Sequence, residues 1–579
     1  MQYKLVGQNN YLMNPIETVL KNRGVEDIYN FLNVTKDMEH DFKLLDNIEK
    51  GVDLIFDHLR MDSKIYLQID TDVDGVTSSV LFYNYIKFIK PNARIQYDIH
   101  TNKIHGINSC DVENDVDLVV VIDAGTNDVE EHRKLSSRNK DILIIDHHEV
   151  DEDVGLHNIL ATENLVLVNN QACDYPNKAL SGVGVMYKLA QAMDAKLGIN
   201  KADDYLDLVA MGLVGDLMDT RSLETRYYIM QGIKKITNPL IKAIIKKNDY
   251  QIKGHVNIKT IGWNISPFIN AVIRFGTQEE KLDMFEAMTE DSEKTIPYKK
   301  RGSDFTVHQP LPEAMARISG NIRGKQNRVR DKSVKVIMEM IEEENLDSNK
   351  VMIVDVTDKL DKSLTGLVAG QLANVYKRPT LLIRLNKCGK YTGSGRNYNN
   401  SPLDDFKELI NGTNCFEFAR GHASAFGIEI LPENLELAKD MLEKHLSDMV
   451  FDKKFDVDFI IPYSNLKTSV IKELAEHADI WGKEVSEPFI CVEDININVE
   501  TDILVMGKSE NTIKFEVKDI EFIMFKAEDI IEDLRENYAG ENISITVVGT
   551  CDINEYNGKK TYQVKVQDCN YEKTNKIRF

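Results

Sequence analysis

Three short apolar runs constrain the fold of this 579-residue chain more than any other feature of its sequence. Each run is rich in Val, Ile and Leu and stops at an aspartate: residues 64–69 precede Asp70, residues 118–122 precede Asp123, and residues 142–145 precede Asp146. Near-continuous apolar runs are typical of parallel strands that are buried on both faces, and helical patterns lie between them. This part of the chain is therefore predicted to form an α/β layer fold.

The length of the chain calls for several domains at roughly 100–200 residues each. We expect two α/β domains joined by a long helical connector, with a C-terminal all-β module. The expected boundaries are a helical lead-in at 1–60, a first α/β domain at 61–295, a basic helical connector at 296–345, a second α/β domain at 346–450 and the β module at 455–579.

The net charge of -22 argues against a protein that coats duplex DNA or anionic membranes by bulk attraction. One stretch runs against this acidic background, and its basic residues are Lys299, Lys300, Arg301, Arg317, Arg323, Lys325, Arg328 and Arg330. A basic stretch is usually a solvated helix face. On so acidic a chain it is also the one clear place for a local contact with a phosphate backbone.

The cysteines and the N-terminus bear on the compartment. The seven cysteines form no C-x-x-C pair, which suits reduced thiols better than a disulfide framework or a zinc site. The N-terminus has no apolar signal-like stretch, and no run of about eighteen apolar residues occurs. We therefore expect a cytoplasmic protein without a membrane segment.

The loop after the first apolar run carries carboxylates at every second position, Asp70, Asp72 and Asp74, followed by Gly75. This spacing lets several oxygens point at one hard divalent cation. An EF-hand begins in the same way, but its twelfth position needs a Glu where this chain has Leu81, and a strand precedes the loop. A solvated acidic turn remains the plain alternative for the loop alone.

Further acidic residues and histidines occur where buried segments end. They are Asp123, the run Asp146-His147-His148, and Asp216 in an apolar helical context. Ligands of open parallel sheets bind outside the carboxyl ends of the strands, so these side chains can converge. Singly, each is as well explained by a helix cap or a hydrogen-bonded core histidine; together they indicate a metal site.

Carboxylates and histidines without cysteine suit Mn²⁺ or Mg²⁺ better than structural zinc. Two such ions, bridged by a carboxylate such as Asp123, would form the clamp used for in-line attack on phosphodiesters. The sequence therefore predicts phosphoryl transfer as the class of reaction.

The order of these motifs resembles that of the DHH phosphoesterase superfamily, and within it the RecJ-type single-strand-specific DNA exonucleases. The resemblance rests on residues 70–75, Asp123-Ala124, Asp146-His147-His148 and Asp216, and on residues 175–176, 180–185 and 267–274. It continues through 365–369, 377–379, 393–396 and 421–427, which resemble the DHH-associated domain. The C-terminal module is faintly similar to the OB-fold of the family.

The resemblance implies a metal-dependent exonuclease that degrades single-stranded DNA from the 5′ end to mononucleotides, with two Mn²⁺ or Mg²⁺ ions. It implies metal ligation by Asp70, Asp72, Asp74, Asp123, His147, His148 and Asp216, all of which except Asp70 are also expected to be catalytic. The residues expected to contact substrate are Asn270, Arg274, Arg323, Arg328, Ser394, Arg396 and His422.

The chain departs from the family pattern at two places. Arg420 stands where the family has the first Gly of Gly-Gly-His, and Val272-Ile273 replace Ala-Gly before Arg274. These changes bear on the shape of the substrate pocket more than on the metal site.

Two other functions remain open at this point. Phosphodiesterases of oligoribonucleotides or cyclic dinucleotides belong to the same superfamily, but they typically lack the extra β module. A non-catalytic replisome scaffold related to RecJ would be expected to have lost metal ligands, whereas all four motifs are intact here. For the exonuclease we expect single-stranded DNA as partner, a helicase or single-strand-binding protein as candidate protein partners, and a monomer.

Overall fold

The computed structural model describes residues 1–574 except 102–104, 301, 303, 452 and 557. Arg301 of the basic stretch therefore lies outside the described residues. The chain divides into two compact units. The first unit comprises Arg23–Lys325 and Asp479–Ser486, and the second comprises Met1–Asn22, Gln326–Ala478 and Glu487–Phe579.

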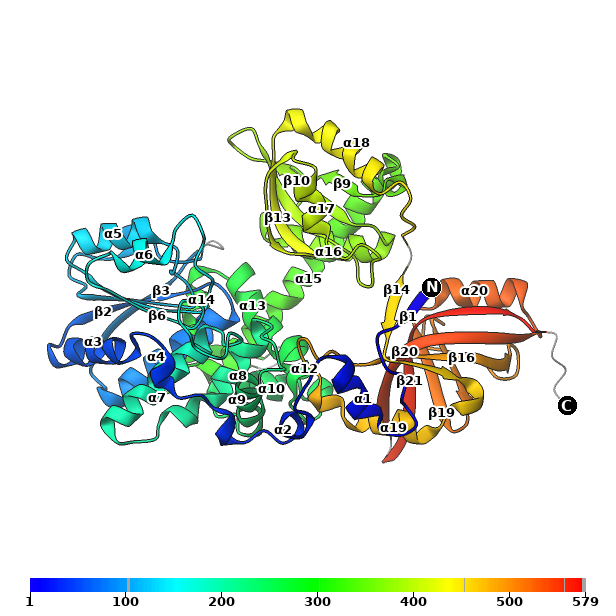
Figure 1. Ribbon diagram of the computed structural model, residues 1–579, viewed down its shortest axis with the longest axis horizontal. Helices are drawn as coiled ribbons and strands as arrows, with labels where there is room; N and C mark the ends of the chain where they lie inside the picture. The colour runs from blue at the N-terminus through cyan, green and yellow to red at the C-terminus, as the bar shows by residue number, and fades with distance from the viewer. Residues whose placement is uncertain (102–104, 301, 303, 452, 557, 575–579) are drawn as a thin grey trace. The chain divides into compact units, whose positions relative to one another are not determined.

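The first unit is built on a five-stranded parallel sheet with the strand order β3-β2-β4-β5-β6 (Figure 1). Its strands are β2 (Lys64–Ile69), β3 (Arg94–Ile99), β4 (Leu118–Ile122), β5 (Asp141–Asp146) and β6 (Leu165–Asn169). The chain order reverses between β2 and β4, which makes the carboxyl ends of these two strands the switch point of the sheet.

Helices cover both faces of this sheet (Figure 1). Leu67 and Val120 belong to a core shared with α3 (Ile48–Arg60), α4 (Val73–Ile89) and α7 (Gly182–Leu197). Tyr66 and Val119 belong to a second core shared with α5 (Val129–Ser137) and α6 (Leu156–Leu160). Successive strand residues thus bury opposite faces, which explains why the strands are apolar at nearly every position.

A layer of helices completes the first unit. Its members are α8 (Leu206–Gly215), α9 (Leu223–Lys234), α10 (Pro239–Lys247), α11 (Asp249–Ile252), α12 (Ile258–Thr260), the π-helical turn η5 (Ile261–Ile265), α13 (Ser266–Phe275) and α14 (Gln278–Glu286). Since α12, η5 and α13 follow one another without a break, residues 258–275 form one helical segment.

The predicted helical connector at 296–345 is helical only in its second part. It begins as an antiparallel hairpin of β7 (Thr295–Lys299) and β8 (Thr306–Pro310). The helix α15 (Leu311–Glu343) follows, and the division between the two units falls within it, after Lys325. The β-branched pairs Thr295-Ile296 and Thr306-Val307, together with the prolines at 297 and 310, favour strands over a helix.

The second unit holds the other predicted α/β sheet, with the strand order β12-β13-β11-β10-β9. Its strands are β9 (Met352–Asp355), β10 (Thr380–Leu385), β11 (Tyr391–Arg396), β12 (Phe416–His422) and β13 (Ala425–Ile430). Only β9 and β10 pair in parallel within this sheet. Its helices are α16 (Thr365–Tyr376), α17 (Phe406–Gly412) and α18 (Leu435–His445).

The predicted C-terminal β module contains a seven-stranded sheet with the order β15-β16-β20-β21-β19-β18-β17. The strands are β15 (Phe459–Pro462), β16 (Phe489–Asn498), β17 (Leu504–Met506), β18 (Thr512–Val517), β19 (Ile520–Phe525), β20 (Asn542–Tyr556) and β21 (Lys559–Lys573). Two helices, α19 (Thr468–Glu476) and α20 (Glu528–Asn537), accompany them.

The helical lead-in predicted for residues 1–60 is wrong at its start. Gln2–Leu5 forms a strand, β1, that pairs in parallel with β14 (Lys454–Val457). The first helices, α1 (Pro15–Asn22) and α2 (Ile28–Leu32), come later and are short. A strand whose partner lies about 450 residues further along cannot be recognised from local periodicity.

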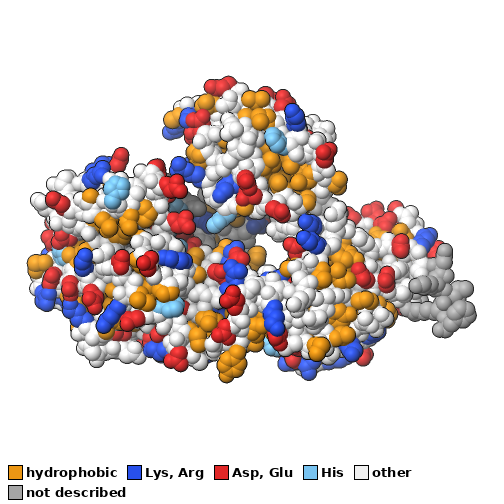
Figure 2. Space-filling view, viewed as in Figure 1, with side chains coloured by type: hydrophobic (Ala, Val, Ile, Leu, Met, Phe, Trp, Pro, Cys, Tyr) orange, Lys and Arg blue, Asp and Glu red, His pale blue; other side chains and the backbone are white. Residues whose placement is uncertain are grey.

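The surface carries many charged side chains, as expected for a chain in which 28% of the residues are charged. Acidic and basic side chains are interspersed on the face shown in Figure 2, with apolar patches between them. Within the part of the chain that the structure describes, no helix has the length and apolar character needed to cross a membrane.

Candidate metal centre

Acidic and histidine side chains gather at the carboxyl edge of the parallel sheet. Asp70 directly follows β2, Asp123 directly follows β4, and Asp146 ends β5. Three groups have candidate ligand atoms within 4.8 Å of one another: Asp123 with Asp146, His147 and His148; Asp70 with Asp72 and His105; and Asp74 with His147 and Asp216. All seven residues that the sequence suggested as ligands fall in these three groups at one edge of the sheet, and their role as ligands remains a prediction.

The loop after β2 leads directly into helix α4. Asp72 caps this helix, since its carboxylate accepts a hydrogen bond of 3.0 Å from the backbone N–H of Gly75. Gly75 packs so tightly that a Cβ atom there would lie 2.6 Å from Cβ of Asp70. The cap fixes the loop at the positive end of the helix dipole, where carboxylates are stabilised.

Asp74 lies in the first turn of α4 and is 1% exposed. Its Oδ1 accepts hydrogen bonds from the Ser181 hydroxyl at 2.8 Å and the Val183 backbone N–H at 3.2 Å. A Cβ atom on Gly212 would lie 2.2 Å from the same oxygen. The start of α7 and a glycine of α8 thus hold this carboxylate from two sides.

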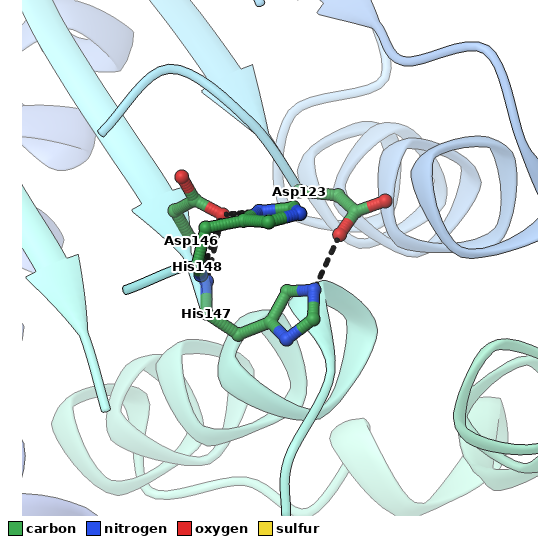
Figure 3. A group of neighbouring side chains, drawn as sticks. All are labelled: Asp123, Asp146, His147 and His148. Atoms are coloured by element: carbon green, nitrogen blue, oxygen red, sulfur yellow. Dashed lines mark hydrogen bonds and ion pairs between the residues drawn. The ribbon is translucent and has the colours of Figure 1, made fainter. Parts of the chain in front are cut away.

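Asp123 has a left-handed backbone with φ of 68°, which is uncommon for residues other than Gly, Asn and Asp. Its side chain points at the ring of His147, with Oδ1 3.1 Å from Nε2 (Figure 3). The same Nε2 lies 3.4 Å from Oδ2 of Asp216. A Cβ atom on Gly182 would lie 2.5 Å from Cβ of Asp123, so the approach of α7 requires glycine.

Asp146 supports its neighbours. It accepts hydrogen bonds from the backbone N–H groups of Thr126, His147 and His148 and pairs with Nδ1 of His148 at 2.8 Å (Figure 3). Burial opposes its ionisation, but the hydrogen bond and charge of His148 outweigh burial and keep the pKa of Asp146 well below its usual range. Asp146 in turn raises the pKa of His148 to about 9. The Nε2 atom of His148 is left for a metal when neutral or for a phosphate oxygen when protonated.

The carboxylates at the centre resist ionisation. Burial, together with the charges of Asp74 and Asp72, raises the pKa of Asp123 well above its ordinary value. The same causes raise the pKa of Asp216 to about 8. Burial lowers the pKa of His147. Crowded carboxylates around a neutral histidine are the arrangement that a bound cation stabilises.

Three buried atoms test whether these residues fit a metal. Asp74 Oδ2, Asp123 Oδ1 and His147 Nε2 have no conventional hydrogen-bond partner among the described residues. Buried polar atoms without partners are costly, and here they meet in one cluster. An oxygen-rich set with one imidazole nitrogen suits Mn²⁺ or Mg²⁺. The residues present fit such an ion.

Sequence reasoning missed His105. Its Nδ1 lies 2.7 Å from Oδ2 of Asp70, and the backbone N–H of Gly106 donates to the other oxygen of Asp70 at 3.4 Å. His105 follows β3, whose carboxyl end lies at the same edge of the sheet. Alternating polarity in residues 94–99 is consistent with a strand, but these residues do not form the continuous apolar run that marks β2, β4 and β5.

Three of the predicted substrate contacts belong to the first unit. Asn270 and Arg274 lie one turn apart on α13. Burial lowers the pKa of Arg274, and the charge of Asp72 opposes this effect, so the guanidinium lies within electrostatic reach of the cluster. Arg323 of α15 lies with its guanidinium carbon 5.1 Å from the ring centre of Phe268. Val272 and Ile273, which replace the Ala-Gly of the family pattern, lie on the face of α13 that is buried in the core.

The other predicted contacts belong to the second unit. Arg396 pairs with Ala425, which pairs with His422, while Ser394 pairs with Gly427, which pairs with Arg420. Directly paired residues of antiparallel strands share a face, as do alternate residues of one strand. Ser394, Arg396, His422 and Arg420 therefore share one face of this sheet. Arg328 lies on the part of α15 assigned to the same unit.

Comparison with known proteins finds two matching domain families. The DHH family, N-terminal domain, matches residues 64–213, and the RecJ OB domain matches residues 457–568. A Bacillus subtilis protein provisionally named as an SPbeta prophage-derived single-strand DNA-specific exonuclease, YorK, is 41% identical over 579 residues, covering 98% of this chain and 98% of its own.

Two more distant proteins, one compared by sequence and one by structure, are also similar to this chain. The single-stranded-DNA-specific exonuclease RecJ of Bacillus subtilis is 24% identical over 92% of this chain and 65% of its own. The crystal structure of RecJ from Thermus thermophilus in complex with Mn²⁺ superimposes with a TM-score of 0.72 at 16% identity, covering 96% of this chain and 76% of that chain. The likeness in structure confirms the predicted fold class. With a full-length relative at 41% identity, the chain belongs to the family of RecJ-type single-strand-DNA-specific exonucleases within the DHH superfamily.

Proposed function

We propose that this chain is a metal-dependent exonuclease that degrades single-stranded DNA from the 5′ end to mononucleotides, with two Mn²⁺ or Mg²⁺ ions as cofactors. The observation that carries the proposal is the buried cluster of Asp74, Asp123 and His147 at the switch point of the sheet, in which polar atoms face one another without conventional hydrogen bonds. Relatives named as single-strand DNA-specific exonucleases, and RecJ structures titled as Mn²⁺ and Mg²⁺ complexes, support it.

The three groups of candidate ligands suggest how the side chains divide their work. Asp74, His147 and Asp216 would hold one ion, and Asp70 and Asp72 would hold the other. Asp123, whose Oδ1 lies 3.1 Å from Nε2 of His147, would contribute a further carboxylate. When bound, the two ions activate a water molecule and neutralise charge on the phosphodiester. Asp146 keeps His148 protonated, so that its free Nε2–H can donate to a phosphate oxygen. Arg274 supplies a further positive charge on the side of Asp72.

Restriction to chain ends needs a group that recognises the terminus. Ser394, Arg396 and His422 share one face of the second α/β sheet and offer a hydroxyl, a guanidinium and an imidazole. This is chemistry suited to a terminal phosphate. We assign 5′-phosphate recognition to this face, and binding of the rest of the strand to the C-terminal β module. The seven free thiols suit the reducing cytoplasm.

The experiment follows single-stranded DNA labelled at either end, the matching duplex and a short RNA, each with and without Mn²⁺. Release of labelled mononucleotide from the 5′-labelled single strand, dependent on Mn²⁺, is expected first. Rapid hydrolysis of the RNA alone would favour an oligoribonucleotide phosphodiesterase. Absence of hydrolysis of every substrate would favour a non-catalytic scaffold.

A matched pair of variants tests the end-recognition step. Arg396→Ala should lower the ratio of rates on 5′-phosphorylated and 5′-hydroxyl strands towards one. Arg535→Ala, which removes a surface arginine of the same unit that pairs with Glu510, should leave the ratio unchanged. An equal ratio in wild type and Arg396→Ala would place end recognition elsewhere.

A further inference from the structure

An exposed tryptophan stands on the helical segment that leads away from the metal centre. Trp263 is 72% exposed, whereas the other tryptophan of the chain, Trp481, is 6% exposed. Trp263 lies in the π-helical turn η5, a rare geometry that is often found at functional sites. A ring of this size usually buries much of its surface, so its exposure calls for an explanation.

Trp263 shares one exposed side of the segment 258–275 with four other residues, of which Arg274 is the one related to the metal centre. Lys259, Trp263, Pro267, Asn270 and Arg274 are all exposed or half-exposed. They are spaced three or four residues apart, which aligns them along one side of a helix. At one end of this stripe, burial of the guanidinium lowers the pKa of Arg274 and the charge of Asp72 opposes this effect, so Arg274 lies within electrostatic reach of the cluster. Trp263 lies eleven residues before it, or about 16 Å along a helix that rises 1.5 Å per residue.

The stretch of sequence that carries Trp263 is basic, on a chain whose net charge is -22. One acidic residue from elsewhere in the chain, Asp479, reaches it, where it pairs with His255 and accepts a hydrogen bond from Asn257. Between residues 239 and 275 the only acidic residue is Asp249, and the basic residues are Lys242, Lys246, Lys247, Lys253, Lys259 and Arg274. All of these lysines are exposed, although Lys246 is also 3.9 Å from Glu313. Exposed lysines around an exposed aromatic ring complement the phosphates and bases of a single strand.

Neighbouring elements hold this surface in place. The Asn248 side chain donates to the carbonyl of Asn264 at 3.2 Å, and the Asn264 side chain donates to Gln251 at 2.8 Å. These bonds tie η5 to α11, which carries Tyr250 at 93% exposure. On the α15 side, a Cβ atom at Gly320 would lie 2.6 Å from Cε of Lys247, so that helix packs against the same surface. The ring of Trp263 is thus exposed, while the backbone that carries it is held by hydrogen bonds to neighbouring elements.

We propose that Trp263 is a stacking platform for a base of the single strand, several nucleotides away from the phosphodiester that is cut, with the surrounding lysines contacting the phosphates. This proposal rests on the proposed function in single-stranded DNA hydrolysis and adds a substrate-binding residue to it. Such stacking does not depend on the identity of the base, because every base has a flat aromatic face.

The two tryptophans make the test direct. In a Trp481→Phe background Trp263 is the sole tryptophan, so its emission reports on the ring itself. Titration with an oligo(dT) 20-mer in EDTA, where the strand is not degraded, should quench this emission, whereas the blunt duplex should not. The difference in emission between wild type and Trp263→Phe gives the same information if Trp481→Phe proves unstable.

Binding and kinetics give the second readout. Trp263→Ala should weaken binding of the 20-mer about 5- to 150-fold, the loss typical of one base–aromatic stack. Trp263→Phe should retain most of the affinity. Hydrolysis of a dinucleotide, which is too short to reach from the cluster to Trp263, should keep its wild-type kcat/KM. Tyr29→Ala removes another exposed aromatic ring of the first unit, beside Glu26 and Asp27, and should leave binding unchanged.

The outcomes separate this inference from the function it builds on. If the wild type hydrolyses single-stranded DNA but Trp263→Ala binds the 20-mer within twofold of wild type and the emission is not quenched, the platform is wrong and the function stands. If duplex and single strand quench equally, the ring does not stack on an unpaired base. If the wild type neither binds nor hydrolyses single-stranded DNA, both proposals fail.

Discussion

At the scale of single residues, the metal centre depends on glycines as much as on carboxylates. Gly75, Gly182 and Gly212 each stand where a Cβ atom would come within about 2.6 Å of Asp70, Asp123 or Asp74. Real Cβ atoms do not approach other atoms so closely, so a methyl group at these positions must displace a ligand. Close packing around the carboxylates sets their mutual distances before any ion binds, which is the pre-organisation that a metal site requires.

Gly182→Ala should therefore damage the site without removing a ligand. The added Cβ would lie 2.5 Å from Cβ and 2.7 Å from Cα of Asp123, so the backbone of Asp123 must move. We expect Mn²⁺ affinity to fall at least tenfold, as for other residues that position ligands. Titration with Mn²⁺ measures this loss. Gly412→Ala, where nothing lies within 4 Å of the added Cβ, is the control. Mn²⁺ affinity within twofold of wild type in Gly182→Ala would show that the glycine is dispensable.

Much of this cluster could be predicted, because the carboxyl ends of parallel strands meet at one edge. Asp70, Asp123 and Asp146 follow apolar runs that are easily recognised, and the structure places Asp123 and Asp146 in one group of candidate ligands and Asp70 in another at the same edge of the sheet. The position of His105 could not be predicted in the same way, because β3 is not a continuous apolar run and His105 lies six residues beyond its end. The support given by Ser181 could not be derived, since its contact with Asp74 joins residues 107 positions apart.

At the scale of elements, the strands buried on both faces were predictable and the long-range pairings were not. The strands β2, β4 and β5 are apolar at nearly every position, and this composition by itself predicts burial on both faces. The strand β1 and the β7–β8 hairpin replaced predicted helix, because pairing with a partner strand outweighs a weak local propensity. Helix α5 packs so closely against the sheet that its His132 is fully buried.

Burial lowers the pKa of His132 from 6.5 to about 4. Between these values the unfolded chain binds a proton that the folded chain does not, so His132 destabilises the fold as the pH falls below about 6.5. The loss approaches about 1.4 kcal/mol per pH unit. His132→Leu should flatten the dependence of the urea midpoint on pH between 4.5 and 6.5 in EDTA. His157→Leu, which removes an exposed histidine of α6, should not. A slope in His132→Leu equal to that of wild type would contradict the assignment.

At the scale of the whole molecule, a net charge of -22 must coexist with binding of a polyanion. The two are compatible only if the strand meets local basic surfaces, and the surfaces proposed for this role are α15 and residues 239–275. Binding should therefore depend on salt through a small number of contacts. Each contact that is lost should lower the slope of log affinity against log salt by roughly 0.7 for a single strand.

Arg323→Ala combined with Arg328→Ala should lower this slope by roughly 1.4 and weaken binding to a similar degree on different sequences. Fluorescence anisotropy of labelled single strands at several salt concentrations measures both quantities. Arg133→Ala combined with Lys134→Ala removes the same charge from α5 and should leave the slope unchanged. An unchanged slope in the α15 variant would assign this helix face to solvent.

The most direct test of the whole account is hydrolysis of a 5′-labelled single strand with Mn²⁺ by wild type and Asp123→Asn. Asparagine tolerates the left-handed backbone at this position, so the fold should persist, and loss of one buried carboxylate should leave the metal-free protein at least as stable as wild type. We predict a fall in rate of at least a hundredfold in the variant, with fewer Mn²⁺ ions bound. A variant that folds and still cuts the strand at near the wild-type rate would contradict the metal centre described here.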